Sequence, residues 1–227
     1  MYNFIKKLPI FFLLIMLTSC GGKIQVSSID KSYSTKTVQV DAKIPQFSGL
    51  ESESLEESLN SEYEKTVTSH LETFKKQAAK TGDVSTFTVT TNEHYNKNGF
   101  LSAVTQIDSF VKSTQKNSFR ITKNIDTRRC VEISLSDLFE GDDYIDMINS
   151  RLESTVRDES EKYAGLWEQP KLSENQDFYI KEDALVVYYL PYELSYYERG
   201  FVEIPLKLSD MSGYLKEEYR FLAETTK

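Results

Sequence analysis

Tyrosines and one arginine near residue 200 are the side chains best suited to recognising a ligand. Six aromatic residues fall within 14 positions: Tyr188, Tyr189, Tyr192, Tyr196, Tyr197 and Phe201. Tyrosine and arginine are enriched at energetically important interface positions, because they combine apolar area with a hydrogen-bonding tip. Alternation along a strand sends part of the set inward, so we expect Tyr188 or Tyr189, together with Tyr192, to be structural. The predicted binding residues are Tyr196, Tyr197 and Arg199.

Residues that catalyse reactions are scarce by comparison. His70 and His94 are the only histidines, and the chain has no His-x-x-x-His or Cys-x-x-Cys spacing, so a zinc site of the usual ligands is not expected. Ser195 lacks the Gly-x-Ser-x-Gly context of a nucleophile elbow. Paired carboxylates such as Asp142 and Asp143 are common by chance among 35 acidic residues, and helix caps or solvated faces explain them. We therefore predict no catalytic residue, no metal and no cofactor.

The N-terminus has the features of a signal that leads to lipid attachment. Lys6 and Lys7 precede an uncharged run from residue 8 to 18, about half the roughly 20 residues that a membrane-crossing helix needs, so we interpret residues 1–19 as a signal peptide. Leu17-Thr18-Ser19-Cys20 resembles the lipobox of bacterial lipoproteins, which implies cleavage before Cys20 and lipid on its sulfur. The alternative is an ordinary secretory signal with a chance cysteine. The prediction is an extracytoplasmic protein of the bacterial envelope, anchored to a membrane.

The mature chain is acidic and long enough for one sizeable domain or two small ones. Removal of 19 of the 227 residues leaves 208 and takes away two lysines and no acid, so the formal charge changes from −8 to −10. Nucleic acid and anionic lipid surfaces are therefore poor ligands. Residues 20–36 are polar and predict a flexible tether. Cys130 then has no partner for a disulfide; it is either a buried core cysteine or a reactive thiol, and no nearby histidine favours the second.

Periodicity predicts the elements of the first half. Apolar and polar residues alternate over 38–42, which predicts a strand, and Pro45 is expected to end it. Apolar residues from Leu55 to Ala78 recur every three or four positions, which predicts a helix that ends at Gly82. Strands over 87–91 and 100–107 flank Asn98-Gly99, the signature of a tight antiparallel hairpin. Further strands are expected over 119–125 and 130–135.

The second half predicts a helix and a very apolar β segment. The helix starts at the acidic residues 141–143 and buries a stripe of residues from Tyr144 to Val156. Trp167 is expected to continue this helix into the core. Strands follow over 178–180, 185–190 and 201–204, and the tail from residue 209 predicts a further helix. The fold class is α+β, with helices packed on antiparallel sheets in two intertwined or adjacent small units.

Four segments resemble successive signatures of one extracytoplasmic module: Ile44–Leu50, Ile133–Phe139, Asn175–Ile180 and Asp183–Leu194. Together they are similar to the outer domain of the lysozyme-sensing anti-sigma factor RsiV family. The resemblance covers residues 38 to 206. It implies a PdaC-like unit over 37–115, an RsiV-like C-terminal unit of unassigned function over 116–208 and a tail over 209–227.

The resemblance also implies a function: a non-catalytic binding module that recognises a lysozyme-like muramidase or a peptidoglycan-related glycan. With a lipid anchor in place of a membrane-spanning segment, only the binding half of the anti-sigma role is expected. The chain departs from the family at Lys112–Asn117, where a Gly-Gly-Ala-His loop is usual, so its ligand is expected to differ if that loop binds. The alternatives are an enzyme acting on peptidoglycan and a structural lipoprotein without a small ligand.

Overall fold

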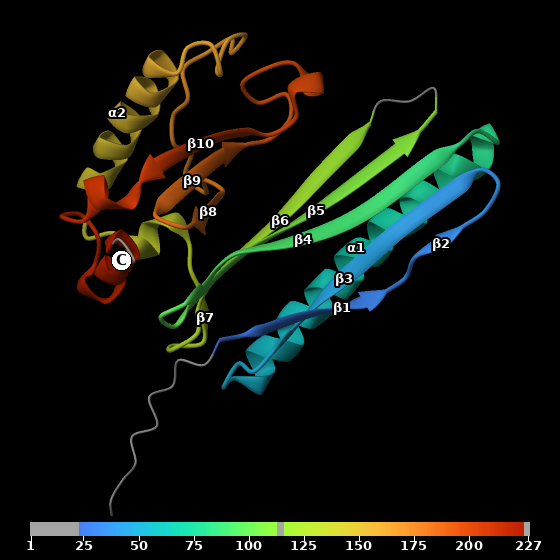
Figure 1. Ribbon diagram of the computed structural model, residues 1–227, viewed down its shortest axis with the longest axis horizontal. Coiled ribbons are helices and arrows are strands. Elements are labelled where there is room, and N and C mark those ends of the chain that lie inside the picture. Colours follow the sequence, from blue (N-terminus) through green and yellow to red (C-terminus); the bar gives the residue numbers. More distant parts are fainter. Residues whose placement is uncertain (1–22, 113–115, 225–227) are drawn as a thin grey trace, which may run out of the picture.

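The computed structural model describes residues 23–112 and 116–224. It contains a large sheet with a long helix on one face and a smaller sheet with a second helix (Figure 1), which confirms the predicted α+β class. The predicted signal peptide and Cys20 lie outside the described residues. Within the described ranges, no helix is long and apolar enough to cross a membrane.

The large sheet has seven strands in the order β1-β3-β4-β5-β6-β7, with β2 paired to β3. Their bounds are β1 Gln25–Asp30, β2 Tyr33–Ser34, β3 Val38–Ser48, β4 Ser85–Lys97, β5 Phe100–Val111, β6 Asn117–Asp126 and β7 Val131–Glu132. β3 and β4 pair in parallel and the other neighbours are antiparallel. The parallel pair follows from the helix between them, because parallel strands need a crossover connection.

The crossover is α1, Glu53–Thr81, which lies along one face of the sheet (Figure 1). Ser52 caps its first turn by accepting a hydrogen bond from the Leu55 amide at 3.2 Å, and Gly82 ends it in the left-handed conformation with φ 65°. The apolar stripe of α1 packs against β3, β4 and β5, as predicted; its buried members are Leu59, Tyr63, Val67, Leu71, Phe74 and Ala78.

The predicted hairpin is confirmed. Lys97 pairs with Phe100, so Asn98 and Gly99 form a two-residue turn, and both have positive φ, 53° and 74°. Such values favour asparagine and glycine, and the local sequence alone therefore fixes this turn.

Three predictions about the first unit are wrong. Residues 20–36 are not a flexible tether throughout, because β1 and β2 pair with β3 as edge strands and Ile24, Val26 and Ile29 pack on the core of the first unit. β3 also runs through Pro45 to Ser48; beyond Ala42 its only strand neighbour is β1, where a missing amide hydrogen is tolerated. The boundary predicted between residues 115 and 116 lies inside the large sheet, since β6 and β7 extend it.

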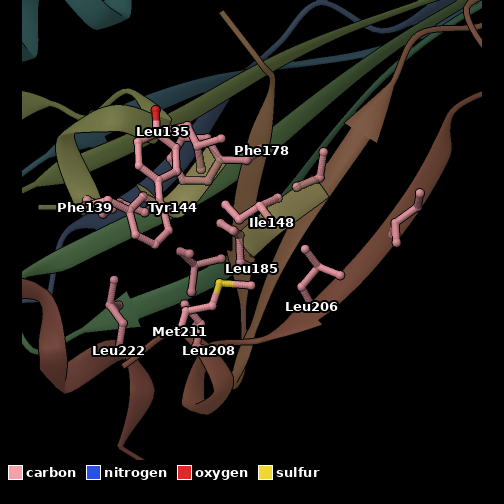
Figure 2. Packing of buried hydrophobic residues seen from close by; sticks show 14 of the residues in the cluster. Leu135, Phe139, Tyr144, Ile148, Phe178, Leu185, Leu206, Leu208, Met211 and Leu222 are labelled. Atoms are coloured by element: carbon pink, nitrogen blue, oxygen red, sulfur yellow. The ribbon is translucent and has the colours of Figure 1, made fainter. Parts of the chain in front are cut away.

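The second unit combines a three-stranded antiparallel sheet, order β10-β9-β8, with α2 and short 3-10 helices. The bounds are η1 Leu135–Leu138, α2 Asp143–Asp158, β8 Phe178–Lys181, β9 Ala184–Tyr189, η2 Tyr197–Arg199, β10 Val202–Lys207, η3 Leu208–Met211 and η4 Glu217–Ala223. Figure 2 shows side chains from these elements meeting in one buried cluster. The predicted helical tail is two 3-10 helices, and it packs into the core through Met211, Leu215, Tyr219 and Leu222.

The second unit covers only one end of the sheet face opposite α1 (Figure 1). β8 lies across β4, β5 and β6, and a small buried cluster of Val104, Tyr179, Val186 and Tyr188 joins the sheets. Polar bonds add to it: Asn124 Nδ2 donates to the Phe178 carbonyl at 2.9 Å, and the Ile180 amide donates to Ser102 Oγ at 2.9 Å. We call this contact region the junction.

Cys130 lies in the turn between β6 and β7 rather than in a core. It is half-buried, its φ is 53°, and its sulfur is 3.6 Å from the Thr127 carbonyl oxygen. The prediction of a buried core cysteine is therefore wrong, because the turn needs a residue in the left-handed region at this point.

Candidate binding surface

Four aromatic side chains meet on the surface of the second unit, and we call them the aromatic patch: Trp167, Tyr192, Tyr196 and Tyr197. The Trp167 ring centroid lies 5.6 Å from that of Tyr196 and 6.0 Å from that of Tyr192, and Tyr192 lies 6.1 Å from Tyr197. These distances are in the range of favourable aromatic pairs. Two chain segments supply the rings, one after α2 and one between β9 and β10.

The patch is open to solvent. Tyr196 is 69% exposed, Tyr192 61% and Trp167 47%, so about half or more of each side chain is free to contact another molecule. Single exposed apolar residues are ordinary on a protein surface, but gathered apolar area rimmed by polar groups marks sites of interaction. An exposed glutamate directly follows three of the four rings in the sequence: Glu168, Glu193 and Glu198. These carboxylates give the rim of the patch negative charge.

Backbone hydrogen bonds fix Trp167 in the patch. Its amide donates to the Leu194 carbonyl at 3.1 Å, and its indole Nε1 donates to the Glu193 carbonyl at 3.2 Å. Trp167 was predicted to continue α2 into the core, and this is wrong, because α2 ends at Asp158 and the following segment turns outward.

Arg199 joins the two segments of the patch. Its guanidinium donates hydrogen bonds to the carbonyl oxygens of Lys162 and Ala164, so the structure places it where it holds the loop after α2 against η2. A charged donor that satisfies two carbonyls makes strong bonds. Arg199, itself exposed, therefore holds the two segments of the patch together.

Tyr197 links the patch to the large sheet. It is only half-exposed, and its hydroxyl accepts a hydrogen bond from the Ser118 amide on β6 at 2.9 Å. Of the three predicted binding residues, Tyr196 and Arg199 are exposed and Tyr197 is half-buried, and Tyr197 and Arg199 also position their neighbours.

The other tyrosines of the sequence cluster divide differently from the prediction. Tyr188 and Tyr189 are both buried; Tyr188 shares a hydrogen bond with Thr122 Oγ1 at 2.8 Å, and burial raises the pKa of both phenols. Tyr192 was expected to be structural, and this is wrong. β9 ends at Tyr189, so strand alternation no longer applies, and Tyr192 has φ 80°, a costly conformation for a bulky residue that is characteristic of functional loops.

An ion pair stands between the patch and the junction. Arg120 on β6 lies 2.6 Å from Glu203 of β10, and its guanidinium lies over Phe201 at 3.9 Å and Tyr188 at 4.9 Å. The Arg120 side chain is only 9% exposed whereas that of Glu203 is 39% exposed, so water still reaches one partner of the pair that links the two units.

The remaining titratable side chains offer no metal centre among the described residues, in which no three or more His, Cys, Asp or Glu gather to hold an ion. His94 stacks on Tyr179 with ring centroids 4.5 Å apart, and His70 stacks on Phe119 at 4.7 Å. At the ends of the Lys112–Asn117 loop, Lys112 pairs with Asp83 and Lys116 with Asp108, each at 3.3 Å.

Two family models match the chain. One described as "Deacetylase PdaC" matches residues 31–111, and one described as "Protein of unknown function (DUF3298)" matches residues 136–209. The predicted order, a PdaC-like segment followed by a segment of unassigned function, is confirmed. The comparison with curated proteins found no match.

Solved structures similar to this fold include two DUF3298 family proteins. A DUF3298 family member from Bacteroides fragilis shares 16% identity over 88% of this chain and 96% of its own, with a TM-score of 0.61. A DUF3298 family protein from Pseudomonas aeruginosa shares 12% identity over 86% and 95%, with a TM-score of 0.59. At such low identity the similarity shows the fold alone.

Proposed function

We propose that this chain is a lipid-anchored, non-catalytic binding module of the bacterial envelope, which recognises a lysozyme-like muramidase or a peptidoglycan-related glycan through the aromatic patch. The observation that carries the proposal is the gathering of Trp167, Tyr192 and Tyr196 as exposed, mutually contacting rings on a fixed backbone. Aromatic side chains in such clusters supply most of the energy at many interfaces.

The patch is organised before a ligand arrives. Hydrogen bonds of Trp167, Arg199 and Tyr197 hold its two segments in place. Little conformational entropy is therefore lost by ordering these loops when a ligand binds. Binding then retains more of the energy gained by covering the rings.

Charge favours a basic protein as the partner. The formal charge of the chain is −8, and Glu168, Glu193 and Glu198 add exposed carboxylates beside the rings. Such a field speeds the encounter with a small basic muramidase, and salt weakens this steering because the Debye length is about 8 Å at physiological ionic strength. The rings rather than the charges would then provide specific affinity.

The test measures binding of lysozyme to the immobilised protein at two salt concentrations. Tyr196→Ala and Tyr192→Ala should each weaken the affinity by about 30-fold, the equivalent of roughly 2 kcal/mol for a hot-spot residue. Tyr33→Ala is the matched control, since Tyr33 is an exposed tyrosine on β2 in the first unit. Affinity that vanishes at physiological salt, or that the patch variants leave unchanged, would contradict the proposal for a protein partner.

A glycan partner is tested on the same surface with soluble peptidoglycan fragments. Uncharged sugar rings stack on aromatic faces, so binding should be nearly independent of salt while still depending on Tyr196 and Trp167. The two partners are thus distinguished by their response to salt.

The alternative of an enzyme that acts on peptidoglycan has one observation in its favour, the match of residues 31–111 to a model described as a deacetylase. Release of acetate from peptidoglycan by the purified protein, lost on heat denaturation, would support it over the binding module. The second alternative, a structural lipoprotein, predicts neither turnover nor binding of lysozyme or glycan.

The anchor is tested separately. Membrane-extracted protein should have the mass of a chain cleaved before Cys20 with acyl groups added, and Cys20→Ala should abolish that mass and release or retain an unprocessed form. A mature chain without acyl mass would refute the lipid anchor without bearing on the aromatic patch.

A further inference from the structure

A second candidate site lies at the junction, away from the aromatic patch. It is a pocket of about 490 Å³, within the roughly 300–1,000 Å³ typical of small-molecule sites. Both units line it: β6 of the large sheet, residues 132–136, the first turn of α2, residues 172–177 and the first residue of β8. Ligand sites are common at such contacts between units. We call it the junction pocket.

Part of the junction pocket is apolar and rigid. Tyr144 and Phe178 belong to the buried cluster of the second unit and also line the pocket, and Tyr144 stacks on Phe139 with centroids 4.5 Å apart. Figure 2 shows the Tyr144 hydroxyl pointing away from the buried cluster. Burial raises the pKa of this phenol further above its usual value, so Tyr144 lines the pocket as a neutral hydrogen-bonding group.

The polar lining consists of neutral groups and carboxylates. Hydroxyl and amide side chains such as Thr122, Ser136 and Asn175 alternate with Glu132, Glu174 and Asp177, and none of the described lining residues is basic. An anionic ligand would meet uncompensated repulsion there. A neutral or cationic ligand rich in hydroxyls would find donors and acceptors around an aromatic base.

Two of the pocket carboxylates, Glu174 and Asp177, have no ion-pair partner among the described residues. Glu132 is paired with Lys123 at 2.9 Å, but Glu174 makes no side-chain hydrogen bond or ion pair with the described residues. Loss of water raises the pKa of Asp177, although Tyr188 and Arg120 act in the opposite direction. A bound ammonium group would offset that desolvation by pairing with the charged form.

We propose that the junction pocket binds a small polyhydroxylated amine, an amino sugar in its protonated form. The apolar face of the sugar ring would lie on Ile145, which is 38% exposed, and on the accessible edges of Tyr144 and Phe178. Its hydroxyls would bond to the Ser, Thr and Asn side chains, and its ammonium would face Glu174 and Asp177. The proposal rests on the pocket alone and is independent of the partner assigned to the aromatic patch.

Because both units build the pocket, its ligand should also stabilise their contact. A molecule that binds only the docked arrangement raises the stability of that arrangement by mass action. The amino sugar should therefore raise the melting temperature, as well as bind.

The experiment titrates the purified protein with glucosamine oligomers and compares their N-acetylated counterparts and glucuronate. We expect binding of the glucosamine form by calorimetry with a rise in melting temperature, weaker binding of the neutral acetylated form, and no binding of the anion. Glu174→Gln should weaken glucosamine binding roughly two- to fivefold, as expected for loss of one partly solvated ion pair. Glu64→Gln, which removes an exposed carboxylate on α1 outside both the pocket and the aromatic patch, is the matched control and should have no effect.

Asn175→Trp places a large side chain at the pocket without removing a structural bond, since Asn175 is exposed and has no side-chain partner among the described residues. It should abolish binding while the melting temperature of the free protein stays within a degree or two. Equal binding of all three sugars, binding that survives Asn175→Trp, or no binding at all would each overturn the proposal. Tyr196→Ala should leave this binding unchanged, which separates the pocket from the aromatic patch.

Discussion

The first unit builds its core from one 29-residue helix laid on long alternating strands, whereas the second unit relies on strands of four to six residues, a 16-residue helix and 3-10 segments. In the first unit, residues of β3 and of the start of β4 alternate between core and surface, and every third or fourth residue of α1 points to the core. β5 and the end of β6 are instead buried at consecutive positions. In the second, turns and short helices bring Leu138, Met211, Leu215 and Tyr219 together from distant parts of the chain.

This difference bears on function. Regular elements leave few irregular backbone segments where side chains can gather at the surface, while the second unit presents two long connections, over residues 159–177 and 190–201. The aromatic patch lies on both of them, and the junction pocket uses the first. The first unit thus acts as a platform, and the second carries the candidate sites.

The largest expected effect tests whether platform and sites unfold together. Phe74 is buried on α1, with its ring centroid 5.4 Å from that of Phe87, so Phe74→Ala should cost about 3–5 kcal/mol of unfolding free energy. Trp167, the only tryptophan, lies in the second unit, and its fluorescence reports on that unit alone. Because the junction is buried and hydrogen-bonded, we expect the two units to unfold together. In Phe74→Ala, the urea transition followed by Trp167 fluorescence should therefore shift to lower urea by as much as the transition followed by far-ultraviolet circular dichroism.

Phe119→Ala is the matched control, since Phe119 is 42% exposed on β6 and its removal should cost less than about 1 kcal/mol. A Trp167 transition that stays in place when Phe74 is removed would mean that the second unit is stable without its platform.

A smaller effect is expected at a buried carboxylate that links the two units. Asp126 is fully buried and accepts hydrogen bonds from the side chains of Arg128 and Arg129, and Arg128 in turn donates to the Glu218 carbonyl of η4 at 3.1 Å. Asp126→Asn should lower the free energy of unfolding by about 1–3 kcal/mol at pH 7, because the Arg128 and Arg129 side chains would lose the buried negative charge to which they donate.

The pH dependence of this cost has a defined sign. Burial of Asp126 opposes its ionisation, but bonds from Arg128 and Arg129 outweigh burial and hold its pKa below the usual 3.8. The stabilisation is therefore present above pH 3.8 and is lost as the pH falls through the lower, folded-state pKa. Urea unfolding should show a difference in free energy of unfolding between wild type and Asp126→Asn that is large at pH 7 and small at pH 2.5. Asp158→Asn is the control, because Asp158 forms an exposed ion pair with Arg157, and it should differ little from wild type at either pH.

The same contrast explains what could be read from the sequence. The α1 stripe and the Asn98-Gly99 turn depend on residues within a few positions of one another, so periodicity and turn chemistry predicted them. β1 was missed because its support is distant: Asn96 holds the backbone of Ile24 at both its amide and its carbonyl. No local pattern encodes such a contact.

The candidate site was predicted in part for a similar reason. Tyr196 could be identified from composition and from its place near a turn, but Trp167 and Tyr192 could not be identified as its neighbours. Their exposure depends on the end of α2 and on Arg199, which holds the carbonyls of Lys162 and Ala164. The junction pocket requires the docking of two units, which no local sequence pattern encodes.

A modest effect should show whether the platform positions the patch. Tyr197→Phe removes the hydroxyl that accepts from the Ser118 amide and should cost about 1 kcal/mol of unfolding free energy, since a partly buried donor is left unpaired. The Trp167 emission should also change if Tyr192 and Tyr197 move with the segment. Tyr214→Phe, for which no hydroxyl bond is found within the described residues, is the control. An unchanged stability would mean that the second unit holds its surface without help from β6.

The smallest effect compares the two histidines, one inside the platform and one at the junction. Burial lowers the pKa of His70 and of His94 below 6.5, and for His94 nearby Lys181 adds to this while Glu203 opposes it. The unfolded chain then binds more protons than the folded one just below pH 6.5. Stability should therefore fall as the pH is lowered from 7 to 5.5. Both rings remain partly solvated, so each loss should stay below about 1 kcal/mol.

The single variants His70→Gln and His94→Gln should each remove part of this slope, and the double variant should flatten it, because no other side chain ordinarily titrates in that window. Which histidine causes the loss of stability at low pH is informative. His94 stacks on Tyr179 of β8 at the junction, whereas His70 stacks on Phe119 within the first unit. Protonation of His94 should weaken the junction, so Trp167 fluorescence should report its share of the slope in urea titrations at pH 5.5 and 7. A slope carried by His70 alone would show that the junction is insensitive to acid and that the platform is the pH-dependent part.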